Sequence, residues 1–259
     1  MSAPHGAGGA TDSAGRPWAG RSFEHTAPST DDGSAPPRLA DALRRFRAGE
    51  ADATAVVDAV RESRLLIPLV AALGETGEGA HGLAVDKSAE LSIVTVAGPD
   101  GRSVMPVFTS VDTMRAWNPK ARPVPADGVR VALAAASEQT DLVVLDPTSE
   151  SEFVLRRPAL WAIAQSQPWS PSATDSAVEA AFAAAVAGVP AVGGVAVSAG
   201  DPDARLAGPE LVIRLALVPG LDRAALDALL ARLQSRWAAD ETIAARVDSM
   251  RVALTTHAP

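Results

Sequence analysis

The chain has 259 residues and a formal net charge of −8, with 47% hydrophobic and 21% charged residues. This apolar content is enough for a folded core, and the length suits one large domain or two ordinary ones. The acidic charge repels phosphate backbones, and the aromatic content of 4% leaves few side chains on which bases could stack, so we expect no nucleic-acid partner.

Cysteine is absent, which excludes disulfides, thiolate nucleophiles and cysteine metal sites. The N-terminus shows no basic patch followed by an apolar stretch, so we expect no secretory signal. Ala180 to Gly200 carries no charge. Because this segment is mostly alanine and glycine, with Pro190 inside it, it predicts a helix, a turn and a buried strand rather than a membrane span. We therefore expect a cytoplasmic protein without a membrane partner.

Residues 1–36 are rich in Gly, Ser, Ala, Thr and Pro without apolar periodicity, which predicts a disordered tail. Pro37 then opens a helical pattern that ends at Gly49, and a second helix follows around Val56 to Val60. The next apolar run, Leu65 to Val70, predicts a strand. Pro68 inside it indicates an edge strand or a bulge, because proline cannot donate to a ladder.

Residues 74–82 form a glycine-rich loop by composition. Residues 91–96 and 103–108 predict a hairpin around the turn at 98–101. A short helix through Trp117 should follow, with a further helix at 128–139 and one from Pro158. Strands are predicted at 142–145 and, on an edge, at 152–155. Residues 37–165 therefore predict a first domain in which helices accompany a mixed sheet.

Residues 166–174 have the composition of a linker. Beyond them the pattern restarts as a helix from Asp175, strands at 190–198 and 210–218, an amphipathic helix at 221–237 and a strand at 247–254. This predicts a smaller α-β-β-α-β domain over residues 175–257. The fold class is therefore α+β, with a small second sheet that has its helices on one side.

Motifs that carry chemistry are weak in this chain. Gly77-x-Gly79-x-x-Gly82 precedes a strand rather than a helix, so we interpret it as a loop and not as a phosphate site. The carboxylate pairs Asp31-Asp32 and Asp201-Pro202-Asp203 lie in polar loops and are interpreted as solvated turn acids. The four histidines lack the i+3 or i+4 spacing of a helical zinc site, and they are His5, His25, His81 and His257. We expect no metal, no cofactor and no catalytic residue.

The segment from Phe108 to Ser110 is the most informative candidate site. A strand that ends in two hydroxyl residues before a helix presents free backbone N–H groups, which suit an anion or a carboxylate. Simple capping of the helix by Thr109 or Ser110 explains the same pattern. Both interpretations stay open from the sequence.

Several short motifs of Pro, Phe, Trp and Leu together resemble the N-terminal domain of the SseB family. They are Leu66-Ile67-Pro68, Asp86-Lys87, Gly98-Pro99-Asp100-Gly101-Arg102, Met105-Pro106-Val107-Phe108-Thr109-Ser110, Ala116-Trp117, Arg122-Pro123-Val124-Pro125 and Val144-Leu145-Asp146-Pro147. Arg157-Pro158-Ala159-Leu160-Trp161 and Gln167-Pro168-Trp169 resemble the form found in high-GC bacteria. The resemblance covers residues 37–169, and the region beyond is similar to the family's second domain, though less specifically.

The resemblance implies a link with enhanced serine sensitivity and carries a secretion-related label. It implies no defined enzymatic activity, cofactor or catalytic residue. Asp146 departs from the Asn-Pro that the family leads us to expect, which argues against a side-chain amide role at that position.

Our leading hypothesis is a non-catalytic binding or regulatory protein. It would hold a protein partner or a small ligand either through the edge of the second sheet or through a contact region of five residues, namely Phe108, Thr109, Ser110, Trp117 and Asp146. One alternative is an enzyme with a site between the two domains that acts on an amino acid or a derivative. A second alternative is a structural homodimer joined edge to edge.

Overall fold

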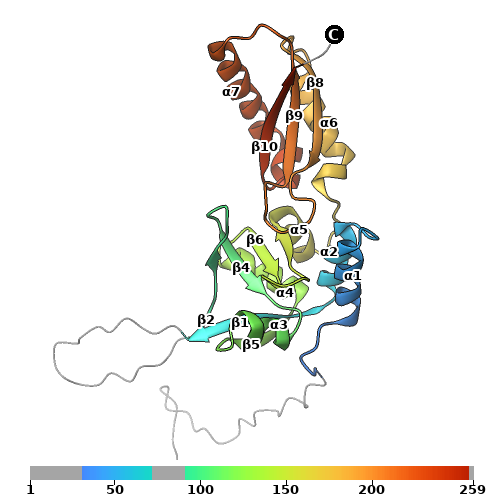
Figure 1. Ribbon diagram of the computed structural model, residues 1–259, viewed down its shortest axis with the longest axis vertical. Helices are drawn as coiled ribbons and strands as arrows, with labels where there is room; N and C mark the ends of the chain where they lie inside the picture. Colours follow the sequence, from blue (N-terminus) through green and yellow to red (C-terminus); the bar gives the residue numbers. More distant parts are fainter. Residues whose placement is uncertain (1–30, 72–90, 257–259) are drawn as a thin grey trace, which may run out of the picture. The chain divides into compact units, whose positions relative to one another are not determined.

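The computed structural model describes residues 31–71 and 91–256 (Figure 1). Most of the predicted tail, the glycine-rich loop with its G-x-G-x-x-G pattern, and all four histidines lie outside the described residues. The described residues from Gly33 onward belong to one compact unit. The division into two domains at residues 166–174 stays a prediction.

Two amphipathic helices open the described chain, as predicted. Helix α1 (Pro37–Arg47) begins at a proline, whose fixed φ suits the first helical turn. Helix α2 (Ala53–Arg61) is capped by Asp52, whose side chain accepts the backbone N–H of Thr54. Both helices turn their apolar faces to the main core, where Leu39 and Val56 are fully buried.

A three-stranded antiparallel sheet follows, in the order β2-β1-β5. Its strands are β1 (Arg64–Ala71), β2 (Leu91–Ile93) and β5 (Arg122–Asp127). The sequence did not predict β5, because two of its six residues are proline.

The prediction that Pro68 marks an edge strand or a bulge is wrong, since β1 is the central strand and its pairing with β5 is regular. The N–H of Leu66 points away from β5, because it donates to Phe108 at 2.8 Å. N–H direction alternates along a strand, so the nitrogen of Pro68 also points away from β5. On that side β2 pairs only with residues 69–71, so the missing donor costs no ladder bond.

A second sheet has the order β3-β4-β6-β7, with a parallel pair at its centre. Its strands are β3 (Val96–Ala97), β4 (Ser103–Val107), β6 (Leu142–Leu145) and β7 (Phe153–Arg156). The predicted hairpin forms only between β3 and β4. Residues 91–93 pair with β1 instead, so the predicted strand at 91–96 is divided between two sheets.

Three helices accompany these strands, namely α3 (Val111–Trp117), α4 (Gly128–Ser137) and α5 (Arg157–Ala164). Buried residues of α4 and α5 join those of α1, α2, β4, β6 and β7 in one core. This core contains the inward side of the parallel pair, including Met105 and Val143. It fixes the ends of β4, β6 and β7, from which candidate functional side chains project.

The C-terminal region contains a third sheet in the order β10-β9-β8. Its elements are η1 (Ser172–Thr174), α6 (Ser176–Val186), β8 (Val192–Ala199), β9 (Leu211–Leu217), α7 (Arg223–Ala239), α8 (Glu241–Arg246) and β10 (Met250–Thr256). Residues Leu211, Ile213 and Leu215 of β9 pack with buried residues of α6, α7 and α8 in a separate core. The α+β class and the α-β-β-α-β order are confirmed, with α8 as an additional short helix.

Strand β8 differs from the expectation of a buried strand. It lies at the edge of its sheet, and its residues are half-buried or exposed along the whole strand. Among the described residues, no helix has both the length and the apolar character needed to cross a membrane.

Candidate functional site

The predicted contact region forms at the carboxyl ends of the parallel strands β4 and β6. Thr109 donates its backbone N–H to one carboxylate oxygen of Asp146 at 2.7 Å and its hydroxyl to the other at 2.6 Å. The hydroxyls of Thr113 and Ser151 add hydrogen bonds of 2.9 and 2.8 Å to the same carboxylate. The donors that suggested a carboxylate site therefore bind a carboxylate of the chain itself.

Ser110 caps α3, since its hydroxyl accepts the backbone N–H of Thr113 at 3.1 Å within a capping box. Phe108 packs against Trp117 with ring centroids 5.3 Å apart. The structure thus brings all five predicted residues together. Phe108, Thr109, Ser110 and Asp146 are buried, and Trp117 is half-buried. Contact of this region with a ligand or partner stays a prediction, and Trp117 is the member most open to it.

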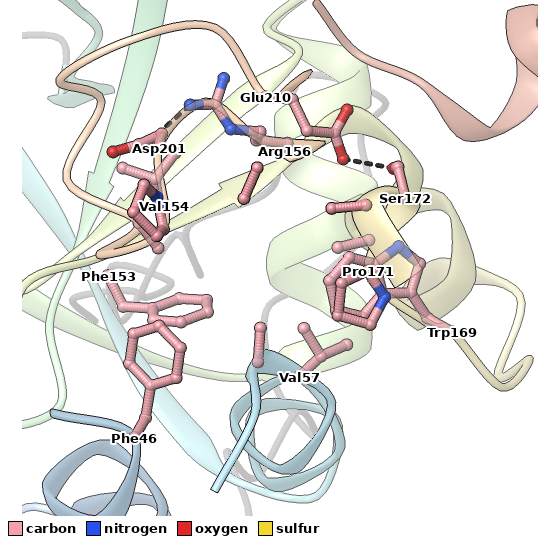
Figure 2. Close-up of a pocket in the computed structure, with 16 residues that line it drawn as sticks. Phe46, Val57, Phe153, Val154, Arg156, Trp169, Pro171, Ser172, Asp201 and Glu210 are labelled. Atoms are coloured by element: carbon pink, nitrogen blue, oxygen red, sulfur yellow. Dashed lines mark hydrogen bonds and ion pairs between the residues drawn. The ribbon is translucent and has the colours of Figure 1, made fainter. Parts of the chain in front are cut away.

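A cavity of about 120 Å³ lies between the first core and the loop that joins β8 to β9 (Figure 2). We call it the junction pocket. Its walls come from α1, α2, β7, α5, the segment around η1 and the start and end of the β8–β9 loop. The lining residues are Phe46, Ala53, Val57, Phe153, Val154, Arg156, Ala159, Trp169, Pro171, Ser172, Ala173, Ala199, Asp201, Pro202, Ala204 and Glu210.

Most of this lining is apolar and includes three aromatic side chains. Phe46 meets Phe153 edge to face, with ring centroids 5.1 Å apart and an interplanar angle of 78°. Trp169 and Pro171 lie across the cavity from this pair (Figure 2). Phe46 occupies this place because it is the last residue of the apolar stripe of α1, and Phe153 because it begins β7. The pocket therefore offers a rigid apolar surface to a ligand group.

A buried ion-pair network forms one polar wall. Arg156 donates to Asp201 at 2.7 Å and to Asp248 at 3.2 Å, and its guanidinium also donates to the carbonyl of Gly208 at 2.9 Å. Arg102 approaches both oxygens of Asp248 at 3.0 Å. The side chains of Arg156, Asp201 and Asp248 are at most 8% exposed. Each charge is thus compensated by close partners, as burial requires.

Glu210 and Ser172 form the remaining polar wall. The Oγ atom of Ser172 lies 2.6 Å from Glu210 Oε1 and also 2.6 Å from the carbonyl oxygen of Arg246. A hydroxyl carries one hydrogen, so the two acceptors compete for the Ser172 proton unless they share it in a bifurcated bond. A protonated Glu210 carboxyl would relieve this competition by donating to Ser172, which could then donate to Arg246. Consistent with this, burial raises the pKa of Glu210 above its ordinary value of 4.5, and the charge of Asp248 acts in the same direction.

The β8–β9 loop closes the pocket through backbone contacts. Gly200 donates to the carbonyl of Glu210 at 2.8 Å, and Val154 of β7 donates to the carbonyl of Ala204 at 2.9 Å. Arg47 adds hydrogen bonds to the carbonyls of Asp203 and Glu152. The loop is therefore tied to β7 and α1, which makes this wall of the pocket preformed.

The interpretation of Asp201 as a solvated turn acid is wrong, because its side chain is 2% exposed and pairs with Arg156. Asp203, two residues on, is exposed as expected. The sequence also gave no role to Arg156 or Glu210. A signal was present, since each is a charged residue directly adjoining an apolar strand run, FVL before Arg156 and LVI after Glu210. Such a position favours a buried charge with a partner, but the partners are distant in sequence.

Residues 39–162 match the sequence profile of the SseB protein N-terminal domain. The chain carries an SseB N-terminal domain. This domain runs from α1 to α5 and supplies Phe46, Phe153 and Arg156 to the junction pocket. No curated protein and no solved structure matches the chain. The resemblance of the C-terminal region to the family's second domain stays a prediction, and that region supplies Asp201 and Glu210.

Among residues 31–71 and 91–256, no three His, Cys, Asp or Glu side chains are grouped so that they could hold a metal ion. The carboxyl groups nearest the junction pocket instead form hydrogen bonds or ion pairs with an arginine, a serine hydroxyl and a backbone N–H group. The site therefore offers an apolar surface and, at Glu210, a buried carboxyl group with a raised pKa.

Proposed function

We propose that this SseB-domain protein is a non-catalytic binding or regulatory protein that holds one apolar group of a ligand or partner in the junction pocket. The cytoplasm is the compartment that its cysteine-free sequence favours. The observation that carries the proposal is an aromatic pocket whose polar lining groups are already paired with one another. A ligand gains binding free energy by burying apolar area on such a surface, and it finds no unpaired charge there.

The volume of the junction pocket limits the size of the group that can occupy it. An apolar protein cavity of about 150 Å³ accepts a benzene molecule, whereas sites for drug-sized ligands measure about 300–1,000 Å³. At about 120 Å³ the junction pocket matches a single side chain or a similar small group. We therefore expect a free apolar amino acid or one apolar side chain of a peptide, rather than a nucleotide or a large cofactor.

The test compares small probes by their effect on thermal stability, because a ligand that binds the native state alone raises its melting temperature. The probes are leucine, phenylalanine, N-acetyl-leucinamide and serine. We expect a rise with the apolar probes and none with serine, although the family resemblance brings a link with serine sensitivity. A rise with N-acetyl-leucinamide but not with leucine would identify a peptide side chain as the occupant.

A blocking variant makes this test specific to the pocket. Ala199 is exposed and lines the pocket rim, so Ala199→Phe should fill the entrance and abolish the shift. Ala207 is exposed in the same loop but does not line the junction pocket, so Ala207→Phe is the matched control and should respond like the wild type. Equal responses from both variants, or no response to any apolar probe, would contradict the proposal.

Glu210 favours a second candidate, an enzyme that acts on an amino acid or a derivative at the same pocket. A carboxyl group whose pKa is raised by burial can serve as a general acid or base. Its oxygens are held by Ser172 and by the backbone N–H of Asp248, which favours a structural role instead. Turnover of any amino acid that disappears in Glu210→Gln, while the folded state persists, would establish the enzyme.

A further inference from the structure

Five of the six edge strands in the described sheets carry a feature that prevents pairing with another chain. Strands β2 and β3 have only three and two residues. Strand β7 is covered by the β8–β9 loop, and β10 contains Arg251. Strand β5 has charged residues at both ends and places Pro123 and Pro125 along its outer side. Short length, charge, proline, a β-bulge and loop cover are the usual protections of sheet edges.

Strand β8 is the sixth edge, and from Gly194 onward it has none of these protections. Its eight residues, VGGVAVSA, include no charge and no proline. Pairing with β9 is regular from Gly194 to Ala199, and the only irregularity lies before Gly194. On β9 the core-facing residues Ile213 and Leu215 are fully buried, whereas their β8 partners Val197 and Val195 are only half-buried. The sheet core is therefore incompletely covered at this edge.

The backbone of β8 directs hydrogen-bonding groups outward. The backbone N–H of Gly200 donates to the carbonyl of Glu210, and this pair continues the register of the β8–β9 ladder. The N–H of Gly200 therefore points to the β9 side. Because this direction alternates, Ser198 and Ala196 also face β9, while the N–H and C=O groups of Val195, Val197 and Ala199 face away from the sheet. The outward groups recur at every second residue, as an additional antiparallel strand requires.

The distribution of charge favours a second copy of this chain as the additional strand beside β8. The molecule carries a net charge of −8, so two copies repel each other over most of their surfaces. Ala180 to Gly200 is free of charge, so β8 can meet another β8 without that repulsion. A charged peptide would find no opposite charge on β8 itself, and Arg214 of the neighbouring strand β9 is already engaged with the Ser198 hydroxyl at 3.0 Å. Two copies of β8 running antiparallel also offer each other the same outward groups, as a two-fold interface requires.

We propose that the protein forms a symmetric homodimer by antiparallel pairing of β8 with β8 of a second copy, which makes one continuous six-stranded sheet. This inference is independent of the junction pocket. Sedimentation equilibrium of the full chain should show a monomer–dimer equilibrium. Dimerisation should tighten as salt is raised, because screening weakens the repulsion between two acidic chains.

Charges placed on the edge give a specific test. Ala196 is exposed on the sheet face opposite the helices, near the middle of β8. In the symmetric register centred on Ala196 a new charge there faces its own copy, so both Ala196→Lys and Ala196→Asp should raise the dimer dissociation constant about ten-fold. An equimolar mixture of the two variants should recover tight association. Thr255→Lys, on the same face of β10, is the control and should leave the constant unchanged.

Cross-linking locates the interface, because the chain has no native cysteine. Opposite side chains in an antiparallel pair lie about 5 Å apart and diagonal ones about 7–8 Å. A short bismaleimide should therefore link Ala196→Cys into dimers, and Thr255→Cys should stay monomeric. A wild type that is monomeric at every concentration, a dimer indifferent to both Ala196 charges, or cross-linking through residue 255 would each overturn the proposal.

Discussion

The guanidinium of Arg156 donates to the carboxylate of Asp201 at 2.7 Å, with 8% and 2% of the two side chains exposed. Removing one member of a buried pair leaves the other charge without compensation. We expect Arg156→Met to lower the free energy of unfolding by about 3–5 kcal/mol in urea denaturation. Arg156→Met/Asp201→Asn should recover part of that loss, and additive losses would show that the two charges do not interact.

Glu210 should make stability depend on pH. Burial raises the pKa of its carboxyl in the folded state above the ordinary value of 4.5, so the native state holds the proton more tightly than the unfolded chain does. The stabilisation is therefore fully present below pH 4.5 and is lost as the pH rises through the folded-state pKa.

Glu210→Gln mimics the neutral acid, because the amide can donate to Ser172 and still accept from Asp248. Relative to the wild type, this variant should become more stable as the pH rises above 4.5. Urea melts at a series of pH values measure the difference. A gap that stays constant with pH would show that the pKa of Glu210 is not raised in the folded protein.

Gly200 should tolerate no side chain. A Cβ at this position would clash with the backbone carbonyl of Pro209, at the point where the β8–β9 loop returns. Gly200→Ala is expected to cost about 1–3 kcal/mol of stability by overpacking. Gly194→Ala is the matched control in β8, since its Cβ would meet only Ala216 at 3.9 Å. Equal melting temperatures for the two variants would show that the loop does not return as described.

Asp146 should tolerate asparagine better than leucine. It has a positive φ of 46°, which Asn adopts more readily than other non-glycine residues, and its carboxylate accepts hydrogen bonds from Thr109, Thr113 and Ser151. Asp146→Leu leaves these donors buried and should cost about 3–5 kcal/mol. Asp146→Asn should cost about 1–2 kcal/mol, because one amide oxygen remains to accept. Equilibrium denaturation of both variants checks the order.

Local patterns in the sequence predicted most of the elements. The stripe of α1, the cap at Ser110 and the apolar run of β6 each depend on neighbours within a few residues. The predictions were wrong where segments distant in the sequence compete to pair with the same strand. Residues 91–93 leave the expected hairpin for β1, and β5 forms despite its prolines because their nitrogens point away from the ladder.

The candidate site was harder to predict from the sequence, because its residues come from segments that are distant in the chain. Phe108 to Ser110 and Asp146 were singled out, and the structure joins them. The junction pocket was not foreseen, because Phe46, Arg156 and Glu210 lie on separate elements and each is unremarkable in its own segment. Only the folded chain shows that Arg156 neutralises an acid 45 residues away.

A nuclear Overhauser experiment on the labelled protein with N-acetyl-leucinamide shows directly whether the junction pocket holds an apolar group. We expect contacts between the methyl groups of the probe and the rings of Phe46, Phe153 and Trp169, which vanish in Ala199→Phe and persist in Ala207→Phe. Contacts confined to other residues, or their persistence in Ala199→Phe, would show that the junction pocket does not bind this group.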